Sequence, residues 1–304
     1  MENRTPQRDW ARTQMIGRFA PSPTGPLHVG NLRTAIATAA SVQAGGGTFL
    51  IRFEDLDMHN ANMANAQQQL DDLASIGVVT SETPLVQSER FDIYHDAIAQ
   101  LTKASLTYEC FCTRKEILET AQAPHGGQVK YPGTCRDLSE TERAERREVR
   151  PGALRLRAQG GRETFIDHIH GTVTGDVDDV VLCRNDGVPS YNIAVVVDDA
   201  LQGVTEVVRG DDLLDVTANQ VHLQKLLGYS TPVYGHVPLV VGADGERLAK
   251  RHGAVTLADL AAQGISAPQI REMLWQSLGQ SGPTFSWDAV PREPWVAPLT
   301  HGKS

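Results

Sequence analysis

The sequence predicts an α/β protein built on a parallel sheet that binds a nucleotide, and three observations lead to this fold class. Residues 17–31 (GRFAPSPTGPLHVGN) have the pattern of an apolar strand, a loop rich in proline and glycine, and the start of a helix. Residues 48–53 (TFLIRF) follow that helix as a second strand, and strand, helix and strand within about forty residues is the unit of a parallel sheet. Residues 180–183 and 204–208 repeat the strand pattern in the second half of the chain.

The loop after the first predicted strand is stiff. Three prolines between residues 21 and 26 fix their φ angles, while Gly25 and Gly30 allow a ligand to approach the backbone closely. The helix that follows presents backbone N–H groups and a positive dipole end, which suit phosphates. His28 at the start of this helix is either a phosphate contact or an ordinary cap.

Acidic residues follow the second predicted strand. Ligands of parallel sheets bind at the carboxyl ends of the strands, and Glu54 is the acidic residue nearest the strand end. The other interpretation is a helix N-cap, with Asp57 or Asn60 capping a helix that ends near residue 75.

Apolar residues at helical spacing account for much of the remaining chain. They predict helices over residues 32–44, 88–104, 213–227, 256–262 and 267–278. The glycine run 45–47 ends the first of them.

The composition excludes several classes of protein. No apolar stretch is long enough to cross a membrane and the N-terminus lacks the apolar core of a signal peptide, so we expect a cytoplasmic protein with no membrane partner. We also expect a monomer. Four cysteines among 304 residues are too few for a disulfide framework. A net charge of −9 argues against indiscriminate nucleic-acid binding but not against a local basic face.

Three of the cysteines fall in two short runs, at Cys110 and Cys112 and at Cys135. Paired runs are what a tetrahedral zinc site needs, with Tyr131 or His125 as the fourth ligand. Free buried cysteines are the alternative. The fourth cysteine stands apart in an apolar strand, as expected of a core residue.

Residues 143–162 hold seven arginines against two glutamates. Alone, this run is typical of a solvated helix face with internal ion pairs. Beside a nucleotide site, it is also a candidate for contacting a polynucleotide backbone.

Taken together, these residues resemble the class I aminoacyl-tRNA synthetases of the glutamyl type. Residues 28–31 (HVGN) resemble the HIGH motif, the preceding RFAPSPTG is the glutamyl-type lead-in, and residues 247–251 (RLAKR) stand in the place of the KMSKS loop. The match runs in order from about residue 16 to residue 278.

The resemblance implies a Rossmann-type parallel-sheet catalytic domain split by a zinc-bearing insertion and followed by a small helical region. It divides the chain into a polar N-terminal extension (1–15), the first half of the catalytic domain (16–106), an inserted acceptor-type domain with the zinc site (107–187), the second half of the catalytic domain (188–245), and the KMSKS-like loop with a helical region that resembles a stem-contact region (246–304).

Within the glutamyl type, the sequence is similar to a shortened branch that transfers glutamate to the queuosine base in the anticodon of tRNA(Asp). That branch binds one structural Zn²⁺ through Cys-x-Cys and Tyr-x-x-x-Cys, which match Cys110, Cys112, Tyr131 and Cys135. The segment YNIAVVVDD, from residue 191, also resembles this branch. The chain ends about fifty residues after the KMSKS-like loop, so the resemblance implies that an anticodon-binding domain is missing.

The resemblance also implies roles for single residues. The positions that match the glutamate-binding set are Arg18, Ala20, Ser22, Glu54, Tyr191 and Arg209. The positions that match the ATP-binding set are His28, Gly30, Asn31, Arg247 and Lys250, of which His28 and Lys250 are the catalytic pair. Arg209 or Arg18 is expected to pair with a substrate carboxylate, Glu54 with the α-ammonium group, and Mg²⁺ with ATP.

The sequence departs from the family in the KMSKS-like loop, where Ala249 replaces a serine and Arg247 replaces a lysine. The lost hydroxyl weakens the contact with a phosphate oxygen without abolishing activation. Three alternatives stay open: a truncated glutamyl-tRNA synthetase that charges a tRNA 3′ end, a catalytically impaired RNA-binding or regulatory paralogue, and a small-molecule ligase that forms adenylates.

Overall fold

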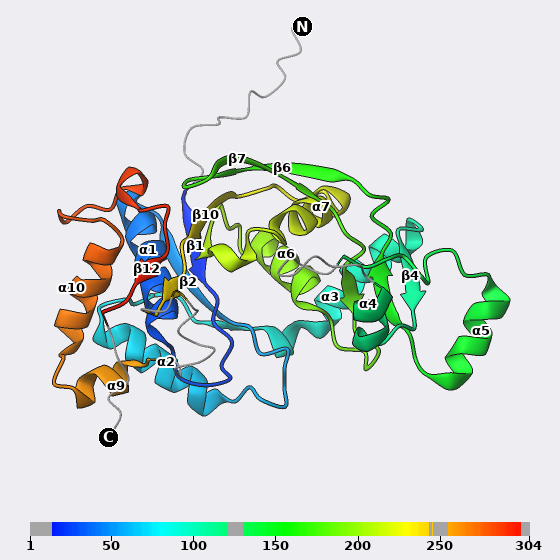
Figure 1. Ribbon diagram of the computed structural model, residues 1–304, viewed down its shortest axis with the longest axis horizontal. Helices are drawn as coiled ribbons and strands as arrows, with labels where there is room; N and C mark the ends of the chain where they lie inside the picture. The colour runs from blue at the N-terminus through cyan, green and yellow to red at the C-terminus, as the bar shows by residue number, and fades with distance from the viewer. Residues whose placement is uncertain (1–13, 121–129, 243–244, 246–254, 299–304) are drawn as a thin grey trace, which may run out of the picture.

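The computed structural model describes residues 14–120, 130–242, 245 and 255–298. Among these residues a seven-stranded sheet forms the centre of the molecule (Figure 1). Its strands are, in sheet order, β3 (Leu85–Val86), β2 (Thr48–Phe53), β1 (Ile16–Phe19), β9 (Glu206–Gly210), β10 (Val233–Val237), β6 (Arg162–Asp167) and β7 (Gly171–Asp176). All neighbours are parallel except β6 and β7, so the predicted α/β fold with a parallel sheet is confirmed.

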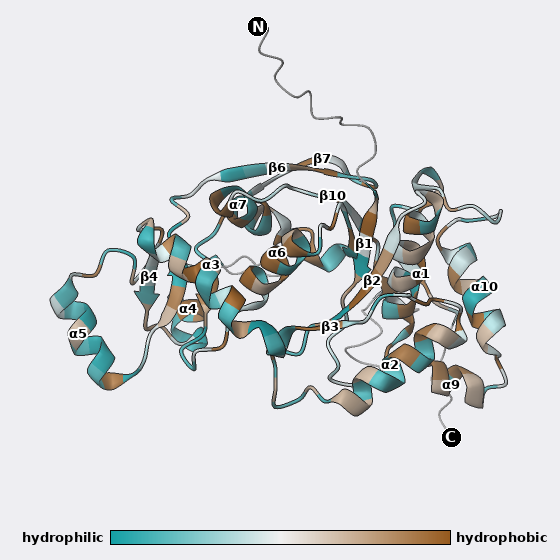
Figure 2. Ribbon diagram, turned by 180° about the vertical axis from the view of Figure 1, so that it is seen from behind, coloured by the Kyte–Doolittle hydropathy of each residue, from teal (hydrophilic) through white to brown (hydrophobic). Residues whose placement is uncertain are grey.

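Helices cover both faces of this sheet. On one side α1 (Val29–Ala44) packs against β1 and β9, and α10 (Ala267–Ser277) packs against α1. On the other side lie α3 (Phe91–Lys103), α6 (Tyr191–Leu201) and α7 (Thr217–Leu227), as Figures 1 and 2 both show. The buried apolar residues therefore form separate clusters on the two sides of the sheet.

Most predicted elements occur where the sequence pattern placed them. Strand 48–53 is β2 with the same bounds. Strand 180–183 occurs as β8 (Val181–Cys183), but it belongs to a separate antiparallel sheet and not to the parallel one. One cap prediction is wrong: Asn62, not Asp57 or Asn60, caps α2 (Met63–Ser75), and its side chain accepts the backbone N–H of Asn65 at 2.8 Å. Cap identity depends on where the loop turns into the helix, which composition does not reveal.

Part of residues 107–187 forms a smaller unit. The strands β4 (Thr107–Cys110), β5 (Ala153–Leu156) and β8 (Val181–Cys183) make an antiparallel sheet, flanked by α4 (Arg114–Thr120) and α5 (Glu140–Val149). Figure 2 shows α5 as a mostly hydrophilic helix at the end of the molecule. The hairpin β6–β7, in contrast, was not predicted, and it joins the main sheet beside β10.

The C-terminal region is largely helical, as predicted, and packs on α1. It contains α9 (Leu257–Ala262), α10, and the short parallel pair β11 (Val240–Val241) and β12 (Trp295–Val296). Short 3₁₀ helices occur at Gln87–Arg90 (η1), Asp211–Leu213 (η2) and Trp287–Ala289 (η3). None of the described helices combines the length and the apolar character needed to cross a bilayer.

A buried arginine joins α1 to this C-terminal region. Arg33 donates hydrogen bonds to the carbonyl oxygen of Pro238 at 2.6 Å and to both oxygens of Ser277 at 3.0 Å. Burial lowers the pKa of Arg33 to about 10, with Asp211 opposing the shift, so the guanidinium stays charged at neutral pH. It therefore fixes the position of α1 relative to α10 and to the loop after β10.

Gly17 allows β1 and α1 to lie in close contact. A Cβ atom at this position would lie 2.4 Å from Cγ2 of Val42, well inside van der Waals contact. The two elements that this contact joins carry Arg18 and His28 at their ends. A side chain at position 17 would therefore push apart the two elements that bound the predicted site.

We expect Gly17→Ala to lower the free energy of unfolding by about 1–3 kcal/mol, because it overpacks the interface between β1 and α1. Val42→Ala removes the clashing methyl group, so the double variant should be less destabilised than the sum of the two single variants. Urea unfolding of the four proteins measures this. Strict additivity would contradict the proposed clash.

Candidate active site

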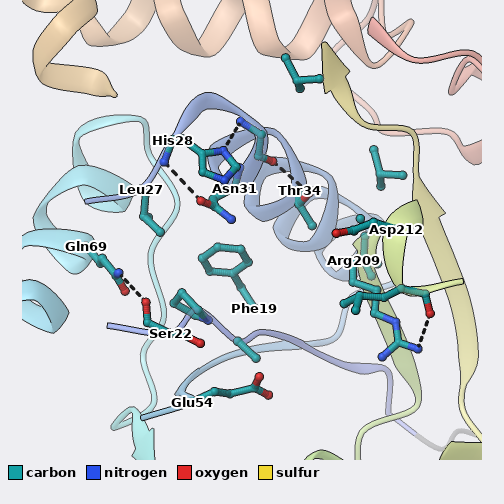
Figure 3. A pocket seen from close by; sticks show the side chains of 18 of the residues that line it. Phe19, Ser22, Leu27, His28, Asn31, Thr34, Glu54, Gln69, Arg209 and Asp212 are labelled. Atoms are coloured by element: carbon teal, nitrogen blue, oxygen red, sulfur yellow. Dashed lines mark hydrogen bonds between the residues drawn. The ribbon is translucent and has the colours of Figure 1, made fainter. Parts of the chain in front are cut away.

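A cavity of about 710 Å³ opens at the carboxyl ends of β1, β2, β9 and β10 (Figure 3). All the predicted glutamate- and ATP-site residues within the described part of the chain line it: Arg18, Ala20, Ser22, His28, Gly30, Asn31, Glu54, Tyr191 and Arg209. Arg247, Ala249 and Lys250 lie outside the described residues. The structure thus brings together residues that are up to about 190 positions apart in the sequence.

His28 acts as a helix cap in the structure, and its contact with a phosphate stays a prediction. Its Nδ1 accepts the backbone N–H groups of Gly30 at 3.1 Å and Asn31 at 3.3 Å, so it caps α1. Burial lowers the pKa of His28, although the Asp212 carboxylate opposes the shift. The ring is therefore neutral at physiological pH, and because Nδ1 is an acceptor, Nε2 carries the proton and can donate to a ligand.

The first backbone N–H groups of α1 are already hydrogen-bonded, whereas the sequence predicted that they would be free for a phosphate. Besides the two that His28 accepts, the amide of Val29 bonds to the carbonyl of Val255 at 2.9 Å and that of Leu32 to the carbonyl of His28 at 3.1 Å. The helix end is thus saturated before a ligand arrives. What α1 can offer a phosphate is Nε2 of His28 and the dipole, rather than a nest of amides.

Gly30 is necessary for this arrangement of His28. A Cβ atom on Gly30 would lie 3.0 Å from both Cε1 and Nδ1 of the imidazole. Any side chain at position 30 therefore moves the ring.

Arg18 is already paired within the protein. Its Nε donates to Oδ1 of Asp199 at 2.9 Å and its Nη2 to Oδ2 at 3.3 Å, in a two-point contact. Arg52 donates to the same carboxylate at 2.7 Å and also contacts Oε1 of Glu54 at 3.2 Å. Of the two arginines expected to pair with a substrate carboxylate, Arg18 thus has its charge balanced by Asp199.

The carboxylates of this network differ in their pKa values. Burial disfavours the charged form of Asp199, but the adjacent Arg18 and Arg52 outweigh it and hold its pKa below the ordinary value. Burial raises the pKa of Glu54, and Arg52 and Arg18 offset the shift only in part. A cation close to Glu54 would stabilise its ionised form.

Arg209 is surrounded by neutral acceptors. Its Nε donates to Nε2 of His236 at 3.1 Å, and its terminal nitrogens donate to Oε1 of Gln220 and Oγ1 of Thr217, each at 2.7 Å. Longer contacts of 3.4 and 3.5 Å reach the Tyr191 hydroxyl and a backbone carbonyl. Within the described part of the chain no carboxylate lies within ion-pair distance of this guanidinium, so Arg209 keeps an unbalanced charge beside the cavity.

Several residues that build the site were not singled out from the sequence. Asp199 and Arg52 fix the network around Glu54, and His236, Gln220 and Thr217 hold Arg209. A sequence signal exists for the first pair, because an arginine inside an apolar strand and two aspartates ending an apolar segment indicate buried charges that must pair. Nothing comparable marks the other three.

The cysteine cluster forms a second candidate site. The Sγ atoms of Cys110, Cys112 and Cys135 lie within 4.8 Å of one another. The hydroxyl of Tyr131 lies 3.2 Å from Sγ of Cys110 and 3.7 Å from Sγ of Cys112, among the three sulfurs. His125 lies outside the described residues.

These distances fit a tetrahedral ion. Four ligands at about 2.3 Å from a zinc ion lie about 3.8 Å from one another, and the sulfurs of Cys112 and Cys135 are 3.6 Å apart. Burial raises the pKa of the Cys112 thiol to about 11, so a bound cation is needed to keep it as a thiolate at neutral pH. The buried cluster is consistent with a metal site.

The basic run at residues 143–162 is extensively paired within the protein. Most of its arginines contact acidic residues, which agrees with the ion-paired interpretation; an RNA contact stays a prediction. The pairs are Arg143 with Glu140, Arg147 with Glu109 and Glu140, Arg150 with Glu116, Arg157 with Asp137 and Arg162 with Asp176. Arg155 instead stacks on the ring of Tyr131, 3.9 Å from its centroid.

Comparison with known proteins places this site in a family context. Residues 14–285 match the family described as tRNA synthetases class I (E and Q), catalytic domain. The chain is 52% identical over 288 residues to a glutamyl-Q tRNA(Asp) synthetase of Nocardia farcinica, covering 92% of each chain. It is 47% identical over 266 residues to a protein of the same name from Cutibacterium acnes, covering 86% of this chain and 76% of the relative.

A solved structure shares the fold of this chain. The crystal structure of glutamate-tRNA synthetase from Elizabethkingia anophelis superposes with a TM-score of 0.73 at 27% identity, covering 91% of this chain and 66% of that one. The chain thus spans about two thirds of the length of that solved protein.

We expect the free energy of unfolding to fall as the pH is lowered from about 6.5 to 4, in part because of His236. Burial lowers the pKa of this histidine to about 4, against the opposing hydrogen bond to Asp167. The unfolded chain binds this proton near pH 6.5 and therefore carries more protons within the window, which destabilises the fold by up to about 3 kcal/mol at its acidic end. Urea unfolding across the window measures the slope.

His236→Phe is the matched variant for this measurement. It removes the titrating group, so its stability should depend less steeply on pH than that of the wild type in the same window. Equal slopes in the two proteins would show that His236 is not held neutral by burial.

Proposed function

The chain belongs to the class I tRNA synthetase (E and Q) family and, within it, to the glutamyl-Q tRNA(Asp) synthetases, and we propose that it activates L-glutamate with ATP and transfers it to the queuosine base in the anticodon of tRNA(Asp). Activation needs no tRNA in this proposal. The observation that supports it most strongly is that Glu54 and Arg209 both line the cavity. A carboxylate that a nearby cation would keep ionised and an unbalanced guanidinium match the ammonium group and the side-chain carboxylate of an acidic amino acid.

The chemistry assigns each end of the substrate. The α-carboxylate must remain free to attack the α-phosphorus of ATP, so the α-ammonium group pairs with Glu54 and the side-chain carboxylate pairs with Arg209. Arg209 is the better of the two arginines for this role, because Arg18 is already paired with Asp199. Ala20, Ser22 and Tyr191 line the same cavity.

ATP is proposed to occupy the end of the cavity near His28 (Figure 3). The carboxylate oxygen forms a bond to the α-phosphorus, the bond to pyrophosphate breaks, and glutamyl-adenylate results. Nε2–H of His28 donates to the phosphates as negative charge develops. Mg²⁺ bound with ATP would neutralise further negative charge on the phosphates.

Arg247 and Lys250 are proposed to act on ATP from the KMSKS-like stretch. Supporting this, Val255, five residues after Lys250, is bonded through its carbonyl to the amide of Val29 next to His28. The chain after the stretch is thus anchored at the phosphate end of the cavity. Gly30 and Asn31 contribute by positioning His28.

We propose one structural Zn²⁺ bound by Cys110, Cys112, Cys135 and Tyr131, which would hold the loop after β4 to the loop before α5. The part of residues 107–187 outside the main sheet is the proposed tRNA-facing insertion, between catalytic halves 16–106 and 188–245. ATP and tRNA(Asp) are both cytoplasmic, so we propose that the protein acts there. We further propose that the protein acts as a monomer.

A second candidate function is charging of a tRNA 3′ end. The fold match to a glutamate-tRNA synthetase supports it. We expect glutamate-dependent ATP–pyrophosphate exchange without tRNA, and transfer of glutamate to tRNA(Asp) that carries queuosine but not to an unmodified transcript. Transfer to the unmodified transcript would favour the second candidate, and no exchange at all would contradict both.

We expect Glu54→Gln to raise the KM for L-glutamate in pyrophosphate exchange by about ten- to a hundredfold, because the partner of the α-ammonium group loses its charge. The KM for ATP should change little. The matched control is Asp57→Asn, since Asp57 is an exposed member of the same acidic run outside the cavity lining. An unchanged KM for glutamate in Glu54→Gln would remove Glu54 from the substrate site.

We expect the purified protein to hold one zinc ion per chain, and Cys135→Ser to lose most of it and to unfold at lower temperature, because a zinc ligand contributes to folding free energy. Cys183→Ser is the matched control, as Cys183 lies in β8 apart from the cluster. Elemental analysis and thermal unfolding measure both effects. Equal zinc content in the two variants would contradict the assigned ligand set.

A further inference from the structure

The contacts around Arg209 define the protonation state of a buried histidine. Arg209 Nε–H can only donate a hydrogen bond, and it points to Nε2 of His236 at 3.1 Å. That nitrogen must therefore present its lone pair. The hydroxyl of Thr217, also 3.1 Å from Nε2, is 2.9 Å from the carbonyl of Leu213 and can direct its proton there.

Asp167 fixes the other side of the same ring. Its Oδ2 lies 2.6 Å from Nδ1 of His236 and also accepts the backbone N–H of His236 at 3.0 Å. Its Oδ1 accepts the backbone N–H groups of Ile169 at 2.8 Å and His170 at 2.9 Å. With only donors around it, Asp167 is ionised and Nδ1 carries the proton of the neutral imidazole.

These residues lie in neighbouring strands and are closed to solvent. Asp167 ends β6, His236 lies in β10 and Arg209 in β9, and the three side chains thus cross the sheet in a row. His236 has no exposed surface and Asp167 is 2% exposed. The ring of His236 packs against the rings of Tyr234 and Phe165, which also contact each other, so it cannot turn away from Asp167 or Arg209 without repacking the core.

We propose that Asp167 and His236 form a positioning pair that orients Arg209 for the side-chain carboxylate of the substrate while leaving the charge of Arg209 unbalanced. The proposal rests on the proposed function, since it concerns the same substrate site.

The neutral ring of His236 lies between the charges of Asp167 and Arg209, and this arrangement has an advantage over a direct ion pair. A carboxylate in direct contact with Arg209 would fix its orientation but would also compete with the substrate, as Asp199 does at Arg18. Asp167 fixes the orientation of the imidazole, and the imidazole fixes the orientation of Arg209. The ring also separates the two charges by its own width. Arg209 is then rigid and still attractive to an anion.

His236→Phe tests the pair because it keeps a ring of similar size but removes the acceptor of Arg209 Nε–H. We expect the KM for L-glutamate in ATP–pyrophosphate exchange to rise about tenfold or more, with the KM for ATP nearly unchanged. His236→Gln restores an acceptor and should recover part of the loss. The matched control is His222→Phe, which removes a similar contact, 2.8 Å from Glu163, away from the cavity.

A measurement on the wild type is independent of how the variants fold. The ¹⁵N chemical shifts of His236, assigned by loss of its signals in His236→Gln, should show a protonated Nδ1 and a bare Nε2 at neutral pH. A protonated Nε2 would overturn the proposal.

The outcomes distinguish a failure of the positioning pair from a failure of the proposed function. Exchange in the wild type together with an unchanged KM for glutamate in His236→Phe would overturn the positioning pair alone. An equal rise of the KM for glutamate and for ATP would also overturn it, because a general structural defect does not distinguish the substrates. No glutamate-dependent exchange in the wild type would overturn the proposed function and the positioning pair with it.

Discussion

The site depends on one buried carboxylate, that of Asp199. It accepts hydrogen bonds from Arg18 at the end of β1 and from Arg52 in β2, so one side chain of α6 joins two neighbouring strands from behind. Removing one partner from such a buried pair costs about 3–5 kcal/mol, because the other charge is left unpaired. Since Arg52 also contacts Glu54, this network fixes the position of Glu54 in the cavity.

The same network makes the two arginines of the cavity different in charge balance. Arg18 and Arg209 both line the cavity, and the resemblance to synthetases treats both as substrate residues. Their surroundings differ in charge: a carboxylate balances Arg18, whereas a histidine ring, an amide and a hydroxyl hold Arg209. A polar group with a net charge and fixed orientation binds an anion with little reorganisation, so Arg209 is the anion-binding residue of the pair.

The sequence predicted much of the fold because its signals are local. The stiff loop after β1, the glycine run after α1 and the apolar strand β2 each follow from spacing and residue type within a few positions. The β6–β7 hairpin was not predicted, because two of the three buried positions of β6 are acidic, Glu163 and Asp167, and Val173 is the one large apolar residue of β7. Its membership of the main sheet depends on pairing with β10, about seventy positions later.

The candidate site was predicted as a set of residues, but not as an electrostatic arrangement. Family resemblance named Glu54, Tyr191 and Arg209, and the fold brings them to one cavity. Asp199, remote in sequence, determines that Arg18 rather than Arg209 has its charge balanced within the protein. The amides at the start of α1 likewise depend on a remote partner, the carbonyl of Val255. Such partners become visible only when the strands are in register.

The most direct test of this account is the ratio of ATP–pyrophosphate exchange with L-glutamate to that with L-glutamine, in the wild type and in Arg209→Gln. The two amino acids differ only where the side-chain carboxylate becomes an amide. We expect a strong preference for glutamate in the wild type and loss of most of that preference in the variant. A variant that still prefers glutamate as strongly as the wild type would contradict it, because the discriminating charge would then lie elsewhere.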